Sequence, residues 1–148
     1  MKADHATQLI LEVFRLNGAL ITAGDALVAD LGLTSARWQV LGAIALQETP
    51  APVVRLAESM GLARQSVQRV ADDLAAEGLV AYAENPNHRR AKLVTLTRKG
   101  ETLYAAAARR QAPWAENLTS GVSAKDLDAA LHTLTRLRTR LAEQGEHS

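Results

Sequence analysis

The chain is 148 residues long, has a formal net charge of +1 and contains no cysteine. The missing thiols exclude disulfides, thiolate metal sites, cysteine nucleophiles and thiol-based redox sensing, and they suit a reducing cytoplasm. No apolar run approaches the ~18 uncharged residues of a membrane span, and the opening MKADHATQLILEVF is unlike a signal peptide. Hydrophobic residues make up 47% and aromatic residues 3%, so Leu and Ala must supply the core, which favours a mainly helical protomer.

The first predicted element is a long helix over residues 6–31. Its apolar side chains cover more than one face, although Gly18 and Gly24 weaken the helix locally. A helix that is apolar on several sides must bury against more than its own small domain. This segment therefore predicts a subunit interface.

A second helix is expected after a break at Gly32. Thr34 is typical of an N-cap and predicts a helix over about 35–47, which Pro50 and Pro52 then break. The side chains expected on its inner face are Trp38, Leu41, Ile44 and Ala45.

Two helices, over about 53–60 and 64–77, are joined by a short turn in which Gly61 supplies a left-handed residue. The second is amphipathic, and Gly78 ends it. Its apolar positions follow i, i+3, i+4, i+7 spacing at Val67, Val70, Ala71 and Leu74. Two helices around a glycine turn are typical of a DNA-binding unit whose second helix enters the major groove.

A β-hairpin is predicted directly after this pair of helices. Strands over 79–84 and 92–96 flank a turn that begins with Asn-Pro-Asn at 85–87. Arg89 and Arg90 follow at the tip. Arginine there suits insertion into a minor groove, because a narrow groove concentrates negative potential.

Two further helices are expected at the end of the chain. Thr97 is predicted to cap the first, which Pro113 should bend or end. Ser123 and Asp126 form a capping pattern for the second, over about 124–143. Its leucines recur in steps of three and four, at positions 127, 131, 134, 137 and 141. Such a seam of about two heptads needs a partner helix, which we expect to be the first helix of a partner chain.

The candidate DNA-reading side chains lie in the first turns of helix 64–77 and at the hairpin tip. Gln can pair bidentately with adenine and Arg with guanine, while Ser and the free N–H groups of a helix start can bind phosphate. The candidates are Arg64, Gln65, Ser66, Gln68, Arg69, His88, Arg89 and Arg90. The alternative is an ordinary solvated face and a solubilising loop, but residues 55–100 carry a net charge of +3 within a DNA-binding pattern.

No group of residues is typical of an enzyme, a metal site or a cofactor site. The four histidines lie on separate predicted elements without metal-ligand spacing, and glycine-rich phosphate loops are missing. They are His5, His88, His132 and His147. We therefore expect no catalytic activity, no metal and no cofactor.

A further hypothesis is a cavity for a small aromatic acid. Arginine would pair with the carboxylate and tryptophan would stack on the ring. The candidate residues are Phe14, Arg15, Arg37 and Trp38. The alternative, which we favour, is that Trp38 is a core residue between helices.

Three segments, in order, resemble the MarR family of bacterial transcription regulators. They are LTSARWQVLGAI (33–44), LAESMGLARQSVQRVADDLAAEGLV (56–80) and NPNHRRAKLVTLTRKG (85–100). The resemblance implies a winged helix-turn-helix domain over 33–99 and a helical dimerisation region from 1–32 and 100–148. It further implies a cytoplasmic homodimer on pseudo-palindromic double-stranded DNA, acting as a repressor that a small, often phenolic, ligand releases.

The resemblance also assigns roles in the DNA contact. Residues 65–69 would lie in the major groove, and Arg90 would be the wing arginine that enters the minor groove. The family's wing usually has Asp two residues before that arginine, where this chain has His88. An imidazole cannot orient Arg90 as a carboxylate would, but it can contact a phosphate, and better when protonated. We therefore predict that DNA affinity rises as the pH falls from about 8 to 6.

Other readings stay open at this point. A winged helix can also serve as a protein-interaction module or as an architectural DNA-binding module that responds to no ligand. An activator is equally compatible with the sequence, which specifies neither the operator nor the regulated genes.

Overall fold

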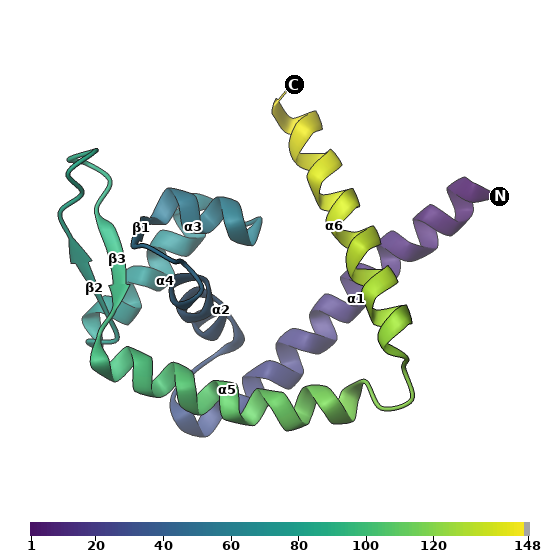
Figure 1. Cartoon of the computed structure of the whole chain (residues 1–148), viewed down its shortest axis with the longest axis horizontal. Coiled ribbons are helices and arrows are strands. Elements are labelled where there is room, and N and C mark those ends of the chain that lie inside the picture. Colours follow the sequence, from purple (N-terminus) through teal and green to yellow (C-terminus); the bar gives the residue numbers. More distant parts are fainter. Residues whose placement is uncertain (147–148) are drawn as a thin grey trace. The chain divides into compact units, whose positions relative to one another are not determined.

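The computed structural model describes residues 1–146, so His147 lies outside the described residues. The chain forms two compact units, Met1–Gln111 and a second that begins at Ala112. The elements in chain order are α1 (Lys2–Val28), the 3₁₀ turn η1 (Ala29–Leu31), α2 (Ser35–Ala45), β1 (Ala51–Pro52), α3 (Val53–Met60), α4 (Arg64–Ala76), β2 (Val80–Ala83), β3 (Leu93–Leu96), α5 (Arg98–Leu118) and α6 (Ala124–Glu146) (Figure 1). The predicted fold, mainly helical with a small β-wing, is confirmed.

The sheet has three antiparallel strands in the order β1-β3-β2, one more than the sequence predicted. The additional strand β1 pairs with β3 through Ala51 opposite Val94. Its second residue is Pro52, which has no N–H to donate and is tolerated because β1 lies at the edge of the sheet. This short strand ties the chain entering α3 to the base of the wing.

The helix-turn-helix forms as the sequence predicted. Gly61 ends α3 with φ at +67°, a left-handed conformation that only glycine adopts without cost. Helix α4 begins three residues later and buries Val67, Ala71 and Leu74. Thr34 caps α2 by accepting a hydrogen bond from the backbone N–H of Arg37 at 3.2 Å.

The core of the first unit lies between α2, α3, α4 and the sheet. Its largest fully buried side chains are Leu41, Leu56, Leu74, Val28, Val40, Val67 and Val94. Trp38 is half-buried and packs against this cluster, which agrees with its interpretation as a core residue. Aliphatic packing on one face of α4 therefore presents the opposite face to solvent.

The start of α5 packs tightly against Gly78 and Leu79, the residues that follow α4. Thr97 caps α5 by accepting from the N–H of Gly100 at 3.1 Å, and its own hydroxyl donates to the carbonyl of Gly78 at 2.6 Å. Gly100 is buried, and a Cβ there would lie 2.0 Å from the carbonyl oxygen of Leu79. Only glycine fits this junction between the wing, α4 and α5.

Farther along α5, Arg110 links this helix to the end of α1. Its guanidinium donates to both carboxylate oxygens of Asp30, one at 2.9 Å, and to the carbonyl of Leu27 at 3.1 Å. The hydrogen bond from Arg110 holds the pKa of the Asp30 carboxyl below its usual value. Thus α5 is attached at both ends of its path through the first unit.

Several predicted boundaries differ from the structure. Helix α1 begins at Lys2 rather than residue 6, and its last predicted turn is the 3₁₀ turn η1. Of the two alternatives predicted for Pro113, a bend or an end of the helix, the end is wrong, because α5 continues through Pro113 to Leu118. A proline removes one N–H donor, and here the helix tolerates that loss. Asp126 donates its backbone N–H to the Ser123 hydroxyl at 3.1 Å, which confirms the predicted cap of α6.

No single helix among residues 1–146 is long and apolar enough to cross a membrane. Helices Lys2–Leu31 and Ser35–Ala45 reach that length and composition only together, with an 82° bend between them.

Candidate nucleic-acid interface

The first turns of α4 present polar side chains to solvent. Arg64, Gln65, Ser66 and Arg69 are exposed, whereas Gln68 is half-buried. The exposure follows from the burial of the opposite face of α4 in the core. These are the side chains that a recognition helix offers to base edges and phosphates.

The wing tip is an ordered double turn closed by Asn85. The Asn85 side chain accepts from the N–H of Asn87 at 3.0 Å and donates to the carbonyl of Ala91 at 2.9 Å. Backbone hydrogen bonds from His88 to Asn85 and from Ala91 to His88 complete the loop. His88, Arg89 and Arg90 are all exposed at this tip. These hydrogen bonds therefore fix the backbone conformation of the loop that carries Arg89 and Arg90.

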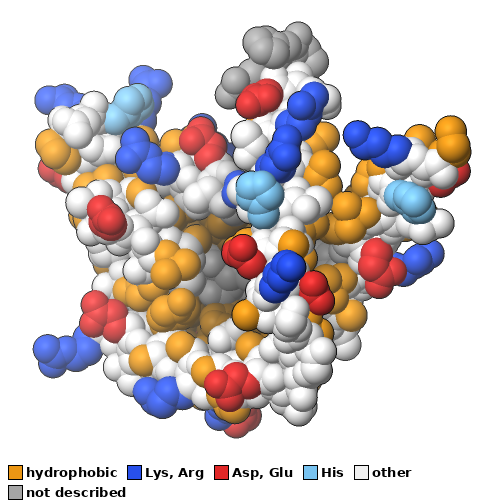
Figure 2. Space-filling model, turned by 45° about the vertical axis from the view of Figure 1, so that its right-hand side comes forward, with side chains coloured by type: hydrophobic (Ala, Val, Ile, Leu, Met, Phe, Trp, Pro, Cys, Tyr) orange, Lys and Arg blue, Asp and Glu red, His pale blue; other side chains and the backbone are white. Residues whose placement is uncertain are grey.

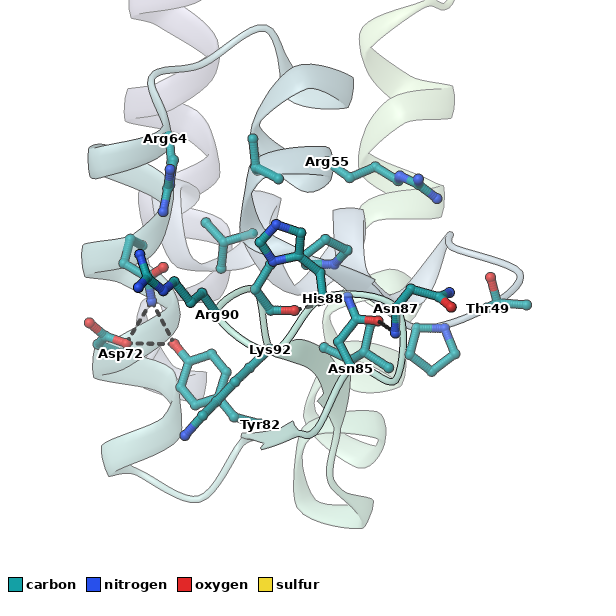
Figure 3. Close-up of a pocket in the computed structure, with 17 residues that line it drawn as sticks. Thr49, Arg55, Arg64, Asp72, Tyr82, Asn85, Asn87, His88, Arg90 and Lys92 are labelled. Carbon is teal, nitrogen blue, oxygen red and sulfur yellow. Dashed lines mark hydrogen bonds between the residues drawn. The ribbon is translucent and has the colours of Figure 1, made fainter.

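A groove of about 850 Å³ lies between α4, the wing and the start of α3 (Figure 3). Figure 3 shows Arg90 extending from the wing toward α4, where Arg64 lies. Four cationic side chains line the groove: Arg55, Arg64, Arg90 and Lys92. The only carboxylate in the lining is Asp72, and no ion pair of the described residues involves any of the four cations. An unneutralised cationic groove of this kind suits a phosphate backbone.

Inside the groove, a hydrogen-bonded network joins α4 to strand β2. The Gln68 amide nitrogen lies 2.9 Å from an Asp72 carboxylate oxygen and 3.2 Å from the Tyr82 hydroxyl. The Tyr82 hydroxyl donates to the same Asp72 oxygen at 2.5 Å (Figure 3). Burial, and then the hydrogen bond to Asp72, raise the pKa of Tyr82 well above its ordinary value, so the hydroxyl stays protonated.

The groove brings together some of the predicted DNA-reading residues and adds others. Arg64, Gln68, His88 and Arg90 all line it. Gln65, Ser66, Arg69 and Arg89 are exposed but belong to the surface beside it. The lining residues that the sequence interpretation did not assign to the site include Arg55, Lys92, Asp72 and Tyr82. The first two were detectable as part of the positive charge of residues 55–100.

The four residues proposed for a small aromatic acid do not form one site within the chain. Phe14 and Arg15 are about 70% exposed on α1, and Arg15 lies 3.6 Å from Glu12. Trp38 lies 4.0 Å from the position of a Cβ on Gly24. Ten residues of helix separate Gly24 from Phe14, which places them about 15 Å apart.

Arg37, the fourth of these residues, belongs to a clamp on the end of α4. It forms an ion pair with Glu77 and donates to the carbonyl of Gly32 at 3.0 Å. The Lys99 ammonium donates to the backbone carbonyl of Glu77 at 3.1 Å. The turn after α4 is therefore held by α2 from one direction and by α5 from another.

Among residues 1–146, no group of three or more His, Asp or Glu side chains is placed to hold a metal ion.

A family model and a relative from Mycobacterium tuberculosis both match this chain. Residues 31–91 match the family model described as MarR family. The uncharacterized protein Rv2011c of Mycobacterium tuberculosis is 34% identical over 135 residues, which cover 91% of this chain and 93% of that protein.

Solved structures agree in fold over nearly the whole chain. The transcriptional regulator BldR from Sulfolobus solfataricus has a TM-score of 0.84 at 23% identity, covering 95% of this chain and 99% of BldR. CouR from Rhodococcus jostii RHA1, bound to p-coumaroyl-CoA, has a TM-score of 0.79 at 23% identity, covering 88% and 91%.

Proposed function

The chain belongs to the MarR family of transcription regulators, and we propose that it binds a pseudo-palindromic operator in double-stranded DNA as a homodimer. Members of this family are regulators rather than enzymes, which confirms the expectation of no catalytic activity. The observation that carries the proposal is the groove between α4 and the wing, where four cationic side chains that form no ion pair within residues 1–146 lie beside the exposed start of α4.

In this proposal the two walls of the groove have different roles. The first turns of α4, with Gln65, Ser66 and Arg69, enter the major groove and contact base edges. Arg90 reaches the minor groove from the wing, with Arg89 and His88 beside the backbone. Arg55, Arg64 and Lys92 neutralise phosphates along the strand between them. The DNA-binding domain is accordingly residues 33–99.

Exposed apolar side chains support dimerisation through residues 1–32 and 100–148. Phe14 is 69% exposed and Leu131 is 64% exposed, and hydrophobic side chains lie open between charged groups in Figure 2. Those on α1 are Leu9, Ile10, Leu11, Val13, Phe14, Leu16, Leu20 and Ile21. Those on α6 are Leu127, Leu131, Leu134, Leu137 and Leu141. Surface of this extent on two helices is typical of an interface between subunits.

We further propose that the protein is a cytoplasmic repressor released by a small aromatic ligand. The p-coumaroyl-CoA in the CouR structure is a precedent for an aromatic ligand on this fold. Two recognition helices must lie about 34 Å apart to enter successive major grooves. A ligand releases the operator only if it binds a dimer with another separation more tightly than the DNA-bound one.

The test is selection of random duplex DNA by the purified full-length protein at moderate salt, read out by sequencing. The proposal predicts an inverted repeat whose half-site centres lie about one helical turn apart. Binding to the enriched site should fall steeply with salt, because each neutralised phosphate releases counterions. A folded dimer that enriches no sequence would refute the proposal and favour a protein-binding role for the winged helix.

A further inference from the structure

The leucine seam of α6, residues 127, 131, 134, 137 and 141, has the same spacing in both directions along the helix. Its steps of four, three, three and four residues are symmetric about Leu134. The seam is open to a partner, since its five leucines are 39% to 68% exposed. Two copies of one helix need such a symmetric spacing in order to pair antiparallel, because each step then meets an equal step.

Helix geometry places the five leucines on one narrow face. At about 100° per residue they fall within an arc of about 120° centred on Leu134, which is the width of a single packed face. Around a two-fold axis beside Leu134, this residue meets its own copy in an antiparallel helix. The first leucine of the seam then lies opposite the last leucine of the partner's seam, and the second lies opposite the fourth.

Arg138 lies within the same arc and interrupts the seam. An arginine at such a position needs a partner for its charge. In the antiparallel pair it lies opposite the partner's Ala130, whose small side chain leaves room for the arginine stem to run to the edge of the contact. The partner's Asp128 lies on that edge, about 3 Å farther along the helix.

The remaining charges of α6 favour the antiparallel direction as well. Arg140 lies on the other flank of the seam from Arg138, and the antiparallel pair brings it beside the partner's Asp126. In a parallel pair each of these side chains would instead lie at the same height as its own copy. Like charges placed together are unfavourable, so the charges of α6 complement a second α6 only when the two helices run antiparallel.

The first helix of a partner chain, which the sequence led us to expect on this seam, offers no carboxylate without a partner of its own. On α1, Asp4 lies 3.7 Å from the N-terminal amine, Glu12 lies 3.6 Å from an arginine one turn on, and Asp25 accepts a backbone N–H at 2.6 Å. Within residues 1–146, the carboxylates of Asp126 and Asp128 take part in no ion pair. The acidic partners for the α6 arginines are therefore on α6 itself.

We propose that α6 pairs antiparallel with α6 of a second copy of this chain, around a two-fold axis beside Leu134. The pairing rests on the homodimer of the proposed function and specifies how its subunits meet. Arg138 forms an ion pair with the partner's Asp128. Arg140 forms one with the partner's Asp126 on the other flank of the seam.

Disulfide crosslinking tests the axis directly, because the chain has no cysteine and one introduced cysteine can bond only to its own copy. Facing Cα atoms of two packed helices lie about 5 Å apart, within the roughly 4.4–6.8 Å of a disulfide. We expect Leu134→Cys in the full-length protein to crosslink under mild oxidation with diamide at least about tenfold faster than Ala129→Cys. Ala129 is the matched control, because it is exposed on the opposite face of α6.

A second pair of variants keeps the test informative if Leu134→Cys folds poorly. Leu127→Cys and Leu141→Cys, coexpressed on differently tagged chains, should crosslink to each other. Neither should crosslink to its own copy, because the axis places these two positions at opposite ends of the contact.

Charge reversal tests the ion pairs. Arg138→Glu should raise the dimer dissociation constant, extrapolated from urea unfolding, by about two- to tenfold, and adding Asp128→Arg should restore it. Arg136→Glu is the matched control, because it makes the same change of charge on the opposite face of α6. An effect of Arg138→Glu no larger than that of Arg136→Glu overturns the ion pair.

The outcomes separate the pairing of α6 from the proposed function. A dimer that selects an inverted repeat, but in which Leu134→Cys crosslinks no faster than Ala129→Cys, overturns the pairing and leaves the regulator intact. The expected crosslinks in a dimer that enriches no repeat support the pairing and refute the DNA-binding function. A monomer refutes the proposed homodimer, and the pairing fails with it.

Discussion

Replacing Gly100 with alanine tests how closely α5 is seated on the chain that leaves the recognition helix. A Cβ at this position would lie 2.0 Å from the carbonyl oxygen of Leu79 and 3.0 Å from its carbonyl carbon. Because Cβ atoms do not approach other heavy atoms within 3.0 Å, the two backbones must separate by about 1 Å. No flexible side chain is available at this contact to give way.

The expected loss of stability combines three contributions. Overpacking against rigid backbone costs about 1–3 kcal/mol. The carbonyl of Leu79 also accepts from the N–H of Thr97 at 3.1 Å, and weakening that bond costs about 0.5–1.5 kcal/mol. Alanine regains up to about 1 kcal/mol through its higher helix propensity. We therefore expect Gly100→Ala to lower the free energy of unfolding by about 0.5–3.5 kcal/mol.

Urea unfolding at one fixed protein concentration measures this effect, since the stability of a dimer depends on concentration. Gly42→Ala is the matched control within α2. A Cβ at Gly42 would lie 3.5 Å from the ring of Tyr104, an ordinary van der Waals contact. That variant should gain about 0.5–1 kcal/mol from helix propensity. If Gly100→Ala unfolds at the same urea concentration as wild type, or a higher one, the close seating of α5 is refuted.

Two other substitutions address the site. Arg90→Ala should weaken binding to many sequences by a similar factor and reduce the salt slope by about one per protomer, and an effect confined to one sequence would contradict this. The fold favours the neutral Tyr82 hydroxyl, because its pKa is higher in the folded than in the unfolded chain. Its contribution to the free energy of unfolding is therefore complete below the ordinary tyrosine pKa of about 10 and is lost as the pH rises above that value. In Tyr82→Phe the melting temperature should therefore fall less steeply between about pH 9.5 and 11 than in wild type. Equal slopes of melting temperature against pH in the two proteins would contradict the hydrogen-bonded network of Gln68, Asp72 and Tyr82.

Local signals in the sequence were sufficient for the helix-turn-helix. The apolar spacing of α4, the left-handed Gly61 and the caps at Thr34 and Ser123 each act over a few residues, and the structure has them as predicted. Strand β1 was missed because two residues give no periodicity, and its pairing with β3 bridges more than 40 residues of chain. The sequence predicted a bend or an end at Pro113, and α5 does not end there because a helix can lose one backbone hydrogen bond and continue.

The site was less predictable than the fold, because its details depend on contacts between distant segments. Sequence alone indicates that Gln68 faces outward with other polar residues, but Tyr82 restrains it from a strand 14 residues away. Arg37 was considered as a partner for a ligand carboxylate, whereas in the structure it pairs with Glu77, 40 residues away. Neither pairing leaves a periodic pattern in the sequence.

These two long-range contacts have a common consequence for the recognition helix. Tyr82 joins α4 to the wing, and the turn after α4 is held by Arg37 of α2 and Lys99 of α5. The helix, the wing and the start of α5 are therefore expected to move as one piece, so the spacing of recognition helices in the proposed dimer depends on α5 rather than on flexing of α4. A carboxylate ligand that bound Arg37 would have to displace Glu77. Loss of that ion pair would weaken the support of the recognition helix but not remove it, because Lys99 still donates to the Glu77 carbonyl at 3.1 Å.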